Sequence, residues 1–479
     1  MFDPYIAIVP AVCVTLGGLA AMMAEAFREP NERLPIGGLA VVSLVASGLA
    51  SILLWGRRAS SFGVVSADDF ALFIDLVLVL IGILTVLLSS AVLDRDRIPR
   101  GEYYALVLFA IAGMMLMASA VDLLIIFLAL EILSLAVYVL TGIRHEAIQS
   151  TEAAFKYFLL GAFSSAFFLY GVAFTYGVAG STRLDAIGVA MSGQGVGANL
   201  MAQFALGLLI VGFAFKVSAV PFHMWTPDAY EGAPAIVAGF MSTGVKAAAF
   251  AAFARVFLSA FGSLSTDWTP IVWLLAVLTM VMGTVMGVAQ TNIKRLLAYS
   301  SIAHAGYLLM ALVAGNEIGK GAILFYLLVY AVTNVAAFGI VALLGAEDRA
   351  NDDLTDYAGL SSRQPLLAGL LTVFLLTLGG FPPTAGFIAK WYLFSAAVSA
   401  GYTGLAIIGV LTSVVSVFFY LRIVVAMYMV EQPAAGSPVS VLRPTTVGAL
   451  IVSVLIVVYL GILPARLLDL AASSIGTIF

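Results

Sequence analysis

Residues 213–234 read FAFKVSAVPFHMWTPDAYEGAP, and this stretch decides how the chain can fold. Lys216 lies about thirteen residues, or roughly 20 Å, into an apolar run that begins near Met201. Pro221 then removes a backbone donor and breaks the helix. A charge at that depth in lipid costs from ~3 to more than 10 kcal/mol, and broken backbone is tolerated there only against protein or water. The stretch predicts a broken transmembrane helix with an ionisable group beside the break, followed by an acidic loop rich in proline and glycine.

The composition of the whole chain is that of a polytopic membrane protein. Of its 479 residues, 62% are hydrophobic and 10% are charged, and the mean hydropathy is +1.11. These values exclude a soluble globular domain, and apolar runs of helical length predict an all-α bundle and not a β-barrel. The lone cysteine, Cys13, allows no internal disulfide. The first apolar segment lacks a basic n-region and a cleavage site, so we interpret it as a transmembrane helix and not as a signal peptide.

About fourteen transmembrane helices can be placed on the sequence by length and hydropathy. They are expected near residues 5–25, 35–55, 70–92, 103–118, 121–142, 152–178, 201–222, 233–261, 268–290, 295–314, 320–345, 366–398, 403–430 and 446–470. The longest polar connections are 179–200, 346–365 and 431–445. None of them is large enough for a soluble domain, so the chain is expected to lie almost wholly in the bilayer.

The lysines and arginines of the loops predict the orientation, because they gather on the cytoplasmic side of membrane proteins. An outward N-terminus places eleven of them inside: Arg28, Arg33, Arg95, Arg97, Arg100, Arg144, Lys294, Arg295, Arg349, Arg363 and Arg443. It places five outside: Arg57, Arg58, Arg183, Lys320 and Arg466. Both termini are therefore predicted to face the outside.

An internal repeat is visible in pattern. Tyr157–Phe168 (YFLLGAFSSAFF) and Tyr326–Ala337 (YLLVYAVTNVAA) share the placement of small and polar residues. Each precedes a span that proline interrupts near a lysine: Lys216 with Pro221, then Lys390 with Pro382 and Pro383. Repeats of five helices each must have opposite topology, as in transporters with broken helices.

This pattern divides the chain into four predicted regions. Residues 1–100 hold three helices, 101–262 hold the first five-helix repeat (helices 4–8, broken helix 7), 263–432 hold the second, inverted repeat (helices 9–13, broken helix 12), and 433–479 hold helix 14.

Three of the six lysines, Lys216, Lys246 and Lys390, lie deep inside apolar runs. A lysine side chain reaches only about 6 Å, so these three cannot easily place their charge at an interface of a ~30 Å core. Snorkelling remains an equal alternative for Lys156. Glu131 lies at mid-span in VDLLIIFLALEILSLAVYVLTGI (121–143) and is the expected counter-charge of Lys216. At ~4 Å and a dielectric near 20, such a pair attracts by roughly 4 kcal/mol, which suits either a helix staple or a switch of proton affinity.

His304 is the candidate proton relay between the lysines, because a neutral imidazole can accept at one nitrogen and donate at the other. It lies in NIKRLLAYSSIAHAGYLLM, beside Ser300, Ser301 and Tyr307. A satisfied core histidine is the alternative. Asp228 and Glu231 could collect protons at the turn, but a solvated loop is favoured.

The sequence lacks a Gly-rich nucleotide loop, a haem-binding pair, a metal-ligand spacing and a nucleophile constellation. We therefore expect the chain to carry ions and to hold no cofactor of its own.

Four stretches resemble the antiporter-like membrane subunits of proton-pumping NADH:quinone oxidoreductase (respiratory complex I), most specifically the family of N subunits. They are EAAFKYFLLGAFSSAFFLYG (152–171), FKVSAVPFHMWTPDAYEGAP (215–234), NIKRLLAYSSIAHAGY (292–307) and LTLGGFPPTAGFIAKWYLF (376–394). The resemblance covers essentially the whole chain. The DAYEGAP turn discriminates best between the N subunits and the sister subunits and sodium/proton antiporters.

The resemblance implies fourteen helices in two inverted repeats, each with a half-channel, joined by a polar axis at mid-membrane. It implies that proton translocation depends on Glu131, Lys216, Lys246, His304 and Lys390. The implied partners are an M-type subunit, small K- and J-type subunits and the lipid bilayer, with no nucleic acid. NADH, FMN, iron–sulfur clusters and quinone would be used elsewhere in the complex, in a bacterial inner membrane. The rival functions are a subunit of a multi-subunit sodium/proton antiporter and a structural subunit that only fills the membrane arm.

Overall fold

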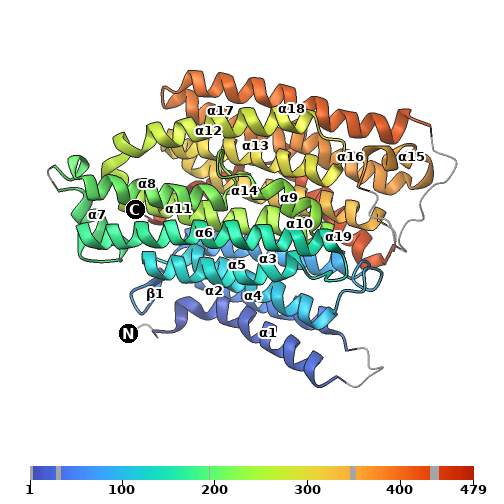
Figure 1. Ribbon diagram of the computed structural model, residues 1–479, viewed down its shortest axis with the longest axis horizontal. Helices are drawn as coiled ribbons and strands as arrows, with labels where there is room; N and C mark the ends of the chain where they lie inside the picture. The colour runs from blue at the N-terminus through green and yellow to red at the C-terminus, as the bar shows by residue number, and fades with distance from the viewer. Residues whose placement is uncertain (1–3, 29–33, 194, 346–351, 432–441, 479) are drawn as a thin grey trace.

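The computed structural model describes residues 4–28, 34–193, 195–345, 352–431 and 442–478. Within these ranges, 12 helical segments are long and apolar enough to cross a membrane. Two shorter apolar helices, α8 (Leu200–Lys216) and α16 (Pro365–Gly379), each end at a break. The helices run side by side in one bundle (Figure 1). The predicted all-α polytopic fold is confirmed.

The N-terminal region forms one edge of the bundle (blue in Figure 1). It contains a short 3₁₀ turn, η1 (Ile6–Ile8), and the helices α1 (Val9–Ala26), α2 (Ile36–Leu54) and α3 (Asp69–Ser89). An antiparallel hairpin, β1 (Ala59–Ser61) with β2 (Val65–Ala67), connects α2 to α3 and was not predicted. Asp68 fixes the start of α3 by accepting a hydrogen bond from the Ala71 amide at 2.9 Å, as an N-cap does.

The next helices are α4 (Arg100–Ser119), α5 (Leu123–Thr141), α6 (Ile148–Ala179) and α7 (Leu184–Met191). Gly180 ends α6 in the left-handed conformation, with φ of 66°. The connection predicted to be plain and polar at 179–200 contains α7. Leu184, Ile187 and Met191 lie on one face of this helix and are buried, whereas Val189 is exposed, so burial of one face accounts for the helix.

The first broken span differs from the prediction in two respects. Helix α8 ends at Lys216, before Pro221, and the acidic stretch expected to be a loop forms the helix α9 (Trp225–Gly232). Pro227 and Asp228 suit its first turn, because that turn needs no amide partner and favours negative charge. The chain continues through α10 (Ala235–Phe240), a π-helical turn η3 (Met241–Val245), α11 (Lys246–Arg255) and a second π-helical turn η4 (Val256–Ala260).

The second half begins with the long helices α12 (Ser265–Val288), α13 (Ile293–Ala314) and α14 (Glu317–Leu344). It continues through α15 (Leu360–Arg363), α16, α17 (Ala385–Ser399) and α18 (Thr403–Met429). Short 3₁₀ turns occur at η2 (Val196–Ala198), η5 (Gly262–Leu264), η6 (Leu354–Tyr357) and η7 (Gly476–Ile478). The apolar windows of α13 and of the α10–η4 segment are 100% buried, so these two spans lie at the centre of the bundle.

The last predicted span, 446–470, is shorter than expected. Helix α19 (Pro444–Ile462) ends before Pro464, and a separate helix, α20 (Ala465–Ile475), packs on α14 and α3. The amide of Phe70 at the start of α3 donates to Thr477 Oγ1 at 3.2 Å. The start of α3 and the C-terminal end of the described chain therefore lie on the same side of the bundle.

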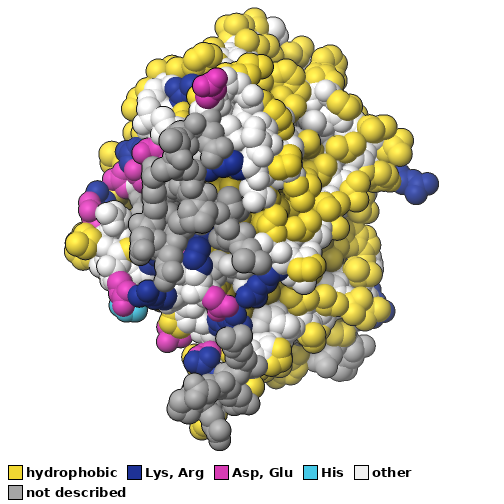
Figure 2. Space-filling view, turned by 90° about the vertical axis from the view of Figure 1, so that its right-hand side faces the viewer, with side chains coloured by type: hydrophobic (Ala, Val, Ile, Leu, Met, Phe, Trp, Pro, Cys, Tyr) yellow, Lys and Arg dark blue, Asp and Glu magenta, His cyan; other side chains and the backbone are white. Residues whose placement is uncertain are grey.

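Charged side chains gather at the opposite end, which Figure 2 shows face on. Five of the basic residues predicted to face the cytoplasm, Arg95, Arg97, Arg144, Lys294 and Arg295, line one pocket. Two others of that set, Arg33 and Arg349, lie outside the described residues.

Candidate functional site

The first helix break is built from backbone groups that find new partners. Ser218 has a φ of 64°, and the Val220–Pro221 peptide is cis. The carbonyl of Phe215, near the end of α8, accepts hydrogen bonds from the Ser218 amide at 3.1 Å and from Trp225 Nε1 at 3.1 Å. Thr226 Oγ1 donates to Ser218 Oγ at 2.8 Å. The break is therefore closed by two side chains of α9.

Lys216 lies at this break with 1% of its surface exposed. Its Nζ donates to Ser134 Oγ of α5 at 2.6 Å. The rings of Tyr138 and Tyr157 face the ammonium, with centroids at 5.5 and 5.9 Å. An ammonium surrounded by aromatic faces and one hydroxyl keeps some electrostatic stabilisation without water.

Glu131, predicted as the direct counter-charge, forms no ion pair with Lys216 among the described residues. Its Oε1 atom is buried and has no hydrogen-bond partner there, although the residue as a whole is half-buried. Ser134 lies one helical turn further along α5 and receives the ammonium instead. The expected contact is thus replaced by an arrangement in which a hydroxyl holds the ammonium near the carboxylate.

Lys246 lies at the centre of the bundle, directly after the first π-helical turn, and is 2% exposed. Its Nζ donates to the carbonyl oxygen of Ser301 at 2.6 Å and also contacts Ser301 Oγ. Tyr330 OH donates to the same Oγ at 2.8 Å. Asn334 Nδ2 donates to Tyr330 OH at 3.0 Å and to Ser242 Oγ at 2.6 Å. Lys246 is therefore the end of a continuous buried hydrogen-bonded chain.

His304, on α13, is also enclosed by hydroxyl groups. Its Nδ1 bonds to Tyr326 OH, and its Nε2 lies 3.1 Å from Tyr420 OH. Tyr420 OH in turn bonds to Ser300 Oγ. Both ring nitrogens have hydroxyl partners that can donate or accept, so the ring can change tautomer without leaving a nitrogen unsatisfied.

The second break lies between α16 and α17, at the two prolines expected to interrupt the span, and the Pro382–Pro383 peptide is cis. Lys390 Nζ donates to the carbonyl oxygen of Gly379 at 3.0 Å and to Ser413 Oγ at 2.9 Å. The lysine thus donates the hydrogen bond to the backbone carbonyl at the end of α16.

A small cavity of about 10 Å³ lies between His304 and Lys390, with Thr377 also on its wall. That is about the smallest space that holds one water. Among the described residues, no direct hydrogen bond joins any two of Lys216, Lys246, His304 and Lys390. All four side chains are buried, and a cavity with space for one water lies between His304 and Lys390.

Several residues of this axis were missed from sequence. On α14, Tyr326, Tyr330 and Asn334 recur at intervals of four residues, which places them on one helix face. A row of polar residues on one face of an otherwise apolar helix could have identified these three residues as part of the site. Arg255, another cation within an apolar run, forms a buried ion pair with Asp68 at 2.7 and 2.8 Å.

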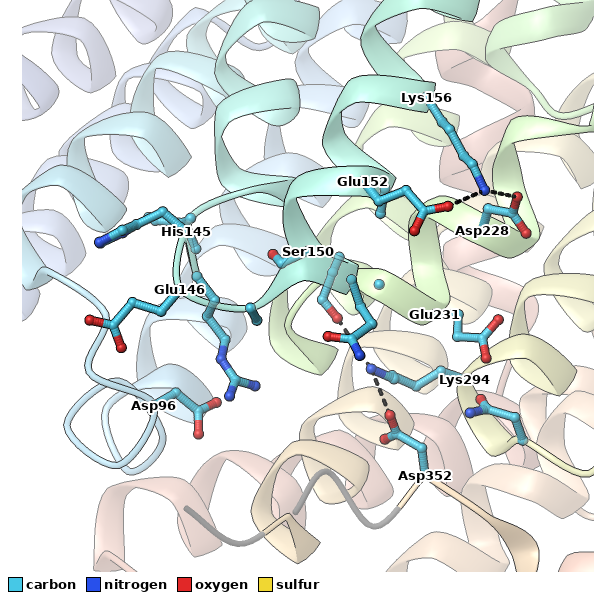
Figure 3. Close-up of a pocket in the computed structure, with 18 of the residues that line it drawn as sticks. Asp96, His145, Glu146, Ser150, Glu152, Lys156, Asp228, Glu231, Lys294 and Asp352 are labelled. Carbon is cyan, nitrogen blue, oxygen red and sulfur yellow. Dashed lines mark hydrogen bonds and ion pairs between the residues drawn. The ribbon is translucent and has the colours of Figure 1, made fainter. Parts of the chain in front are cut away.

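The charged end of the bundle contains a pocket of about 780 Å³ (Figure 3). Asp228 and Glu231, expected to be solvated loop residues, are ion-paired on its wall. Arg295 Nη1 bonds to Asp228 at 2.8 Å and to Glu231 at 2.6 Å, and Lys156 Nζ lies 3.2 Å from Asp228. Lys294, one of the basic residues placed in loops by the sequence, is buried and pairs with Asp352 at 2.8 Å. Burial raises the pKa of Asp352, and the charge of Lys294 opposes that shift.

Two broken helices and a central line of buried cations define an antiporter-like membrane protein. The family model described as NADH:quinone oxidoreductase/Mrp antiporter, transmembrane region, matches residues 120–416. A protein of Trichlorobacter lovleyi described as NADH-quinone oxidoreductase subunit N is 45% identical over 98% of this chain and 97% of its own. Its counterpart in Chloroflexus aggregans is 41% identical over 97% and 96%.

Solved structures agree with these relatives. A chain of respiratory complex I from Thermus thermophilus with bound aureothin superposes with a TM-score of 0.81 at 36% identity, covering 97% of this chain and 99% of that chain. A chain of an archaeal membrane-bound sulfane sulfur reductase has a TM-score of 0.85 at 24% identity, over 99% and 98% of the two chains, which shows a shared fold alone. The chain belongs to the NADH:quinone oxidoreductase/Mrp antiporter family, within its group of N subunits.

Proposed function

We propose that the chain is the proton-translocating N-type subunit in the membrane arm of a bacterial NADH:quinone oxidoreductase. One observation carries this proposal: Lys216, Lys246, His304 and Lys390 lie buried between the two helix breaks, each bonded to a hydroxyl or a carbonyl. Cations at membrane depth are costly and typically mark ion pathways. The family relationship supports the same function.

In this mechanism Glu131 adjusts the proton affinity of Lys216. Approach of the carboxylate stabilises the ammonium, and its withdrawal favours release of the proton, because charges interact strongly in a region of low dielectric. Lys246 and His304 then pass the proton laterally through the hydroxyls around them. Lys390 exchanges it with the far side.

The remaining assignments follow from this role. The charged end of the bundle faces the cytoplasm of a multi-pass inner-membrane protein, so both termini face outward. Residues 101–262 and 263–432 act as two inverted five-helix repeats, each with one broken helix, flanked by the N-terminal residues 1–100 and the C-terminal residues 433–479. The partners are the M-type subunit, the small K- and J-type subunits and lipid.

The chain contributes no redox chemistry. Within the complex, NADH, FMN, iron–sulfur clusters and quinone carry the electrons, and the residues of this chain bind and move protons.

The ion that is moved can be tested directly. The complete complex is reconstituted into liposomes in sodium-free buffer, and NADH oxidation by quinone drives transport. Proton uptake that persists without sodium and collapses with a protonophore is expected. Transport that requires sodium would overturn the proposal in favour of a sodium/proton antiporter.

A further inference from the structure

Helix α9 lies between the charged pocket and the first helix break. On its pocket side, Asp228 bonds to Arg295 at 2.8 Å and to Lys156 at 3.2 Å, and Glu231 bonds to Arg295 at 2.6 Å. Figure 3 shows Lys156 reaching from α6 toward Asp228. Two helices that are distant in sequence, α6 and α13, therefore hold α9 through its two carboxylates.

The other side of α9 closes the surroundings of Lys216. Trp225 is 2% exposed and donates to the carbonyl of Phe215, the residue before Lys216. Its indole stacks on the ring of Tyr157, with centroids 4.3 Å apart, and that ring also faces the lysine ammonium. Ser218, two residues beyond the lysine, is fully buried beneath Thr226. Any displacement of α9 would open the break toward the pocket.

Among the described residues, no helix held by ion pairs covers the second break, against which α19 packs through Gly461. Helix α17 begins at Ala385, directly after Pro383 and Thr384, and Lys390 itself bonds to the carbonyl of Gly379. The charge-clamped helix therefore belongs to the first break alone, and the fold of a broken helix does not require it.

We propose that Lys156, Arg295, Asp228 and Glu231 form an ion-pair latch that holds α9 over the first break. These four residues position Trp225, and Lys216 exchanges protons with the pocket only while the latch is open. The inference rests on the proposed function and adds the element that controls access to its first lysine.

The four side chains are suited to opening. Between 31% and 46% of each is exposed, and ion pairs with such exposure contribute little to stability individually. Lys156 also has a second partner, Glu152, at 2.7 Å, so it can leave Asp228 without losing its charge partner. Partial burial alone would raise the pKa of Asp228, but the bonds from Arg295 and Lys156 lower it overall. The carboxylate thus stays charged near neutral pH, and the latch opens by exchange of partners and not by protonation.

The test measures access to Ser218. In a Cys13→Ser background, Ser218→Cys provides the only thiol of this chain in the intact, detergent-solubilised complex. A membrane-impermeant maleimide, quantified on this subunit after the subunits are separated, reports the exposure of that thiol. With native charges, labelling should be slow. Asp228→Asn combined with Glu231→Gln should speed it severalfold, and Asp228→Glu should leave it slow. Asp185→Asn breaks an exposed Asp–Arg pair elsewhere and should have no effect.

Unchanged labelling in the Asp228→Asn/Glu231→Gln protein would overturn the latch, as would rapid labelling with native charges. Trp225→Phe removes the hydrogen bond to Phe215 but leaves the ion pairs, so it should also speed labelling if α9 is the cover. Native gel electrophoresis confirms that the complex is assembled in every case. Labelling does not require turnover of the enzyme. The labelling result can therefore contradict the latch without contradicting proton pumping through Lys216, and a pumping result can contradict that function without contradicting the latch.

Discussion

Trp225 Nε1 donates a hydrogen bond to the carbonyl oxygen of Phe215 at 3.1 Å, and this contact makes the two helix breaks unequal. In the second break, the freed carbonyl of Gly379 is taken by Lys390 itself at 3.0 Å. Loss of a proton from Lys390 would therefore weaken the closure of its own break. In the first break, the hydrogen bond from the indole does not involve the Lys216 ammonium, so closure of that break does not depend on the charge of the lysine.

Close packing of α19 on the second break gives a stability prediction. A Cβ on Gly461 would lie 1.9 Å from the carbonyl oxygen of Pro383, which is backbone and cannot move aside easily. Gly461→Ala should lower the stability of the complex by about 1–3 kcal/mol or more, as overpacking does. Thermal unfolding of the purified complex measures the loss. Gly448→Ala, on the same helix with nothing within 4 Å, is the matched control and should not destabilise. Equal effects of the two would refute close packing at the break.

The buried ion pair of Arg255 and Asp68 should be sensitive to loss of one partner only. Arg255→Met leaves a buried carboxylate without its partner and should cost about 3–5 kcal/mol. The double variant Arg255→Met/Asp68→Asn should cost clearly less than the sum of the single changes. Recovery of intact complex after heating reports both. Strict additivity would show that the pair is not coupled.

The lowered pKa of Asp228 predicts how α9 responds to pH. A carboxylate whose pKa falls on folding stabilises the folded form above its unfolded pKa of about 3.9, and this stabilisation is lost as the pH falls through the lower folded value. Amide exchange of α9, corrected for intrinsic rates, should therefore show constant protection between about pH 5 and pH 8. Loss of protection within that window would contradict the assignment. Asp228→Asn should show weaker protection throughout.

The fold class and the positions of both breaks could be predicted, because a lysine or a proline within an apolar run is compatible with few backbone structures in a membrane. The residue at which α8 ends could not be predicted. It depends on the positive φ of Ser218, and serine does not by itself indicate a positive φ. Helix α9 was predicted as a loop because its sequence is acidic and contains proline. It is helical where cations from α6 and α13 hold its carboxylates.

The buried lysines and the histidine of the candidate site could be named from the sequence, but the groups to which they bond could not. Lysines at membrane depth are conspicuous in a sequence, whereas Ser134 and Ser301 look like ordinary small helix residues. The hydroxyl that accepts each ammonium depends on which helices meet. For the same reason, Glu131 was expected to contact Lys216, although Ser134, one turn away on α5, receives the ammonium.

The central claim is that protons pass through Lys216 under the control of Glu131. The most direct measurement is the rate of proton pumping, together with the rate of the NADH oxidation coupled to it, by assembled complexes carrying Lys216→Ala or Glu131→Ala. Lys320→Ala, which removes a lysine paired with Glu317 at a helix end, is the control. We expect pumping and coupled NADH oxidation to fall by about tenfold or more in both variants, equivalent to at least ~1.4 kcal/mol, while the control stays near wild type. Near-wild-type pumping in both variants, with normal assembly, would contradict the account.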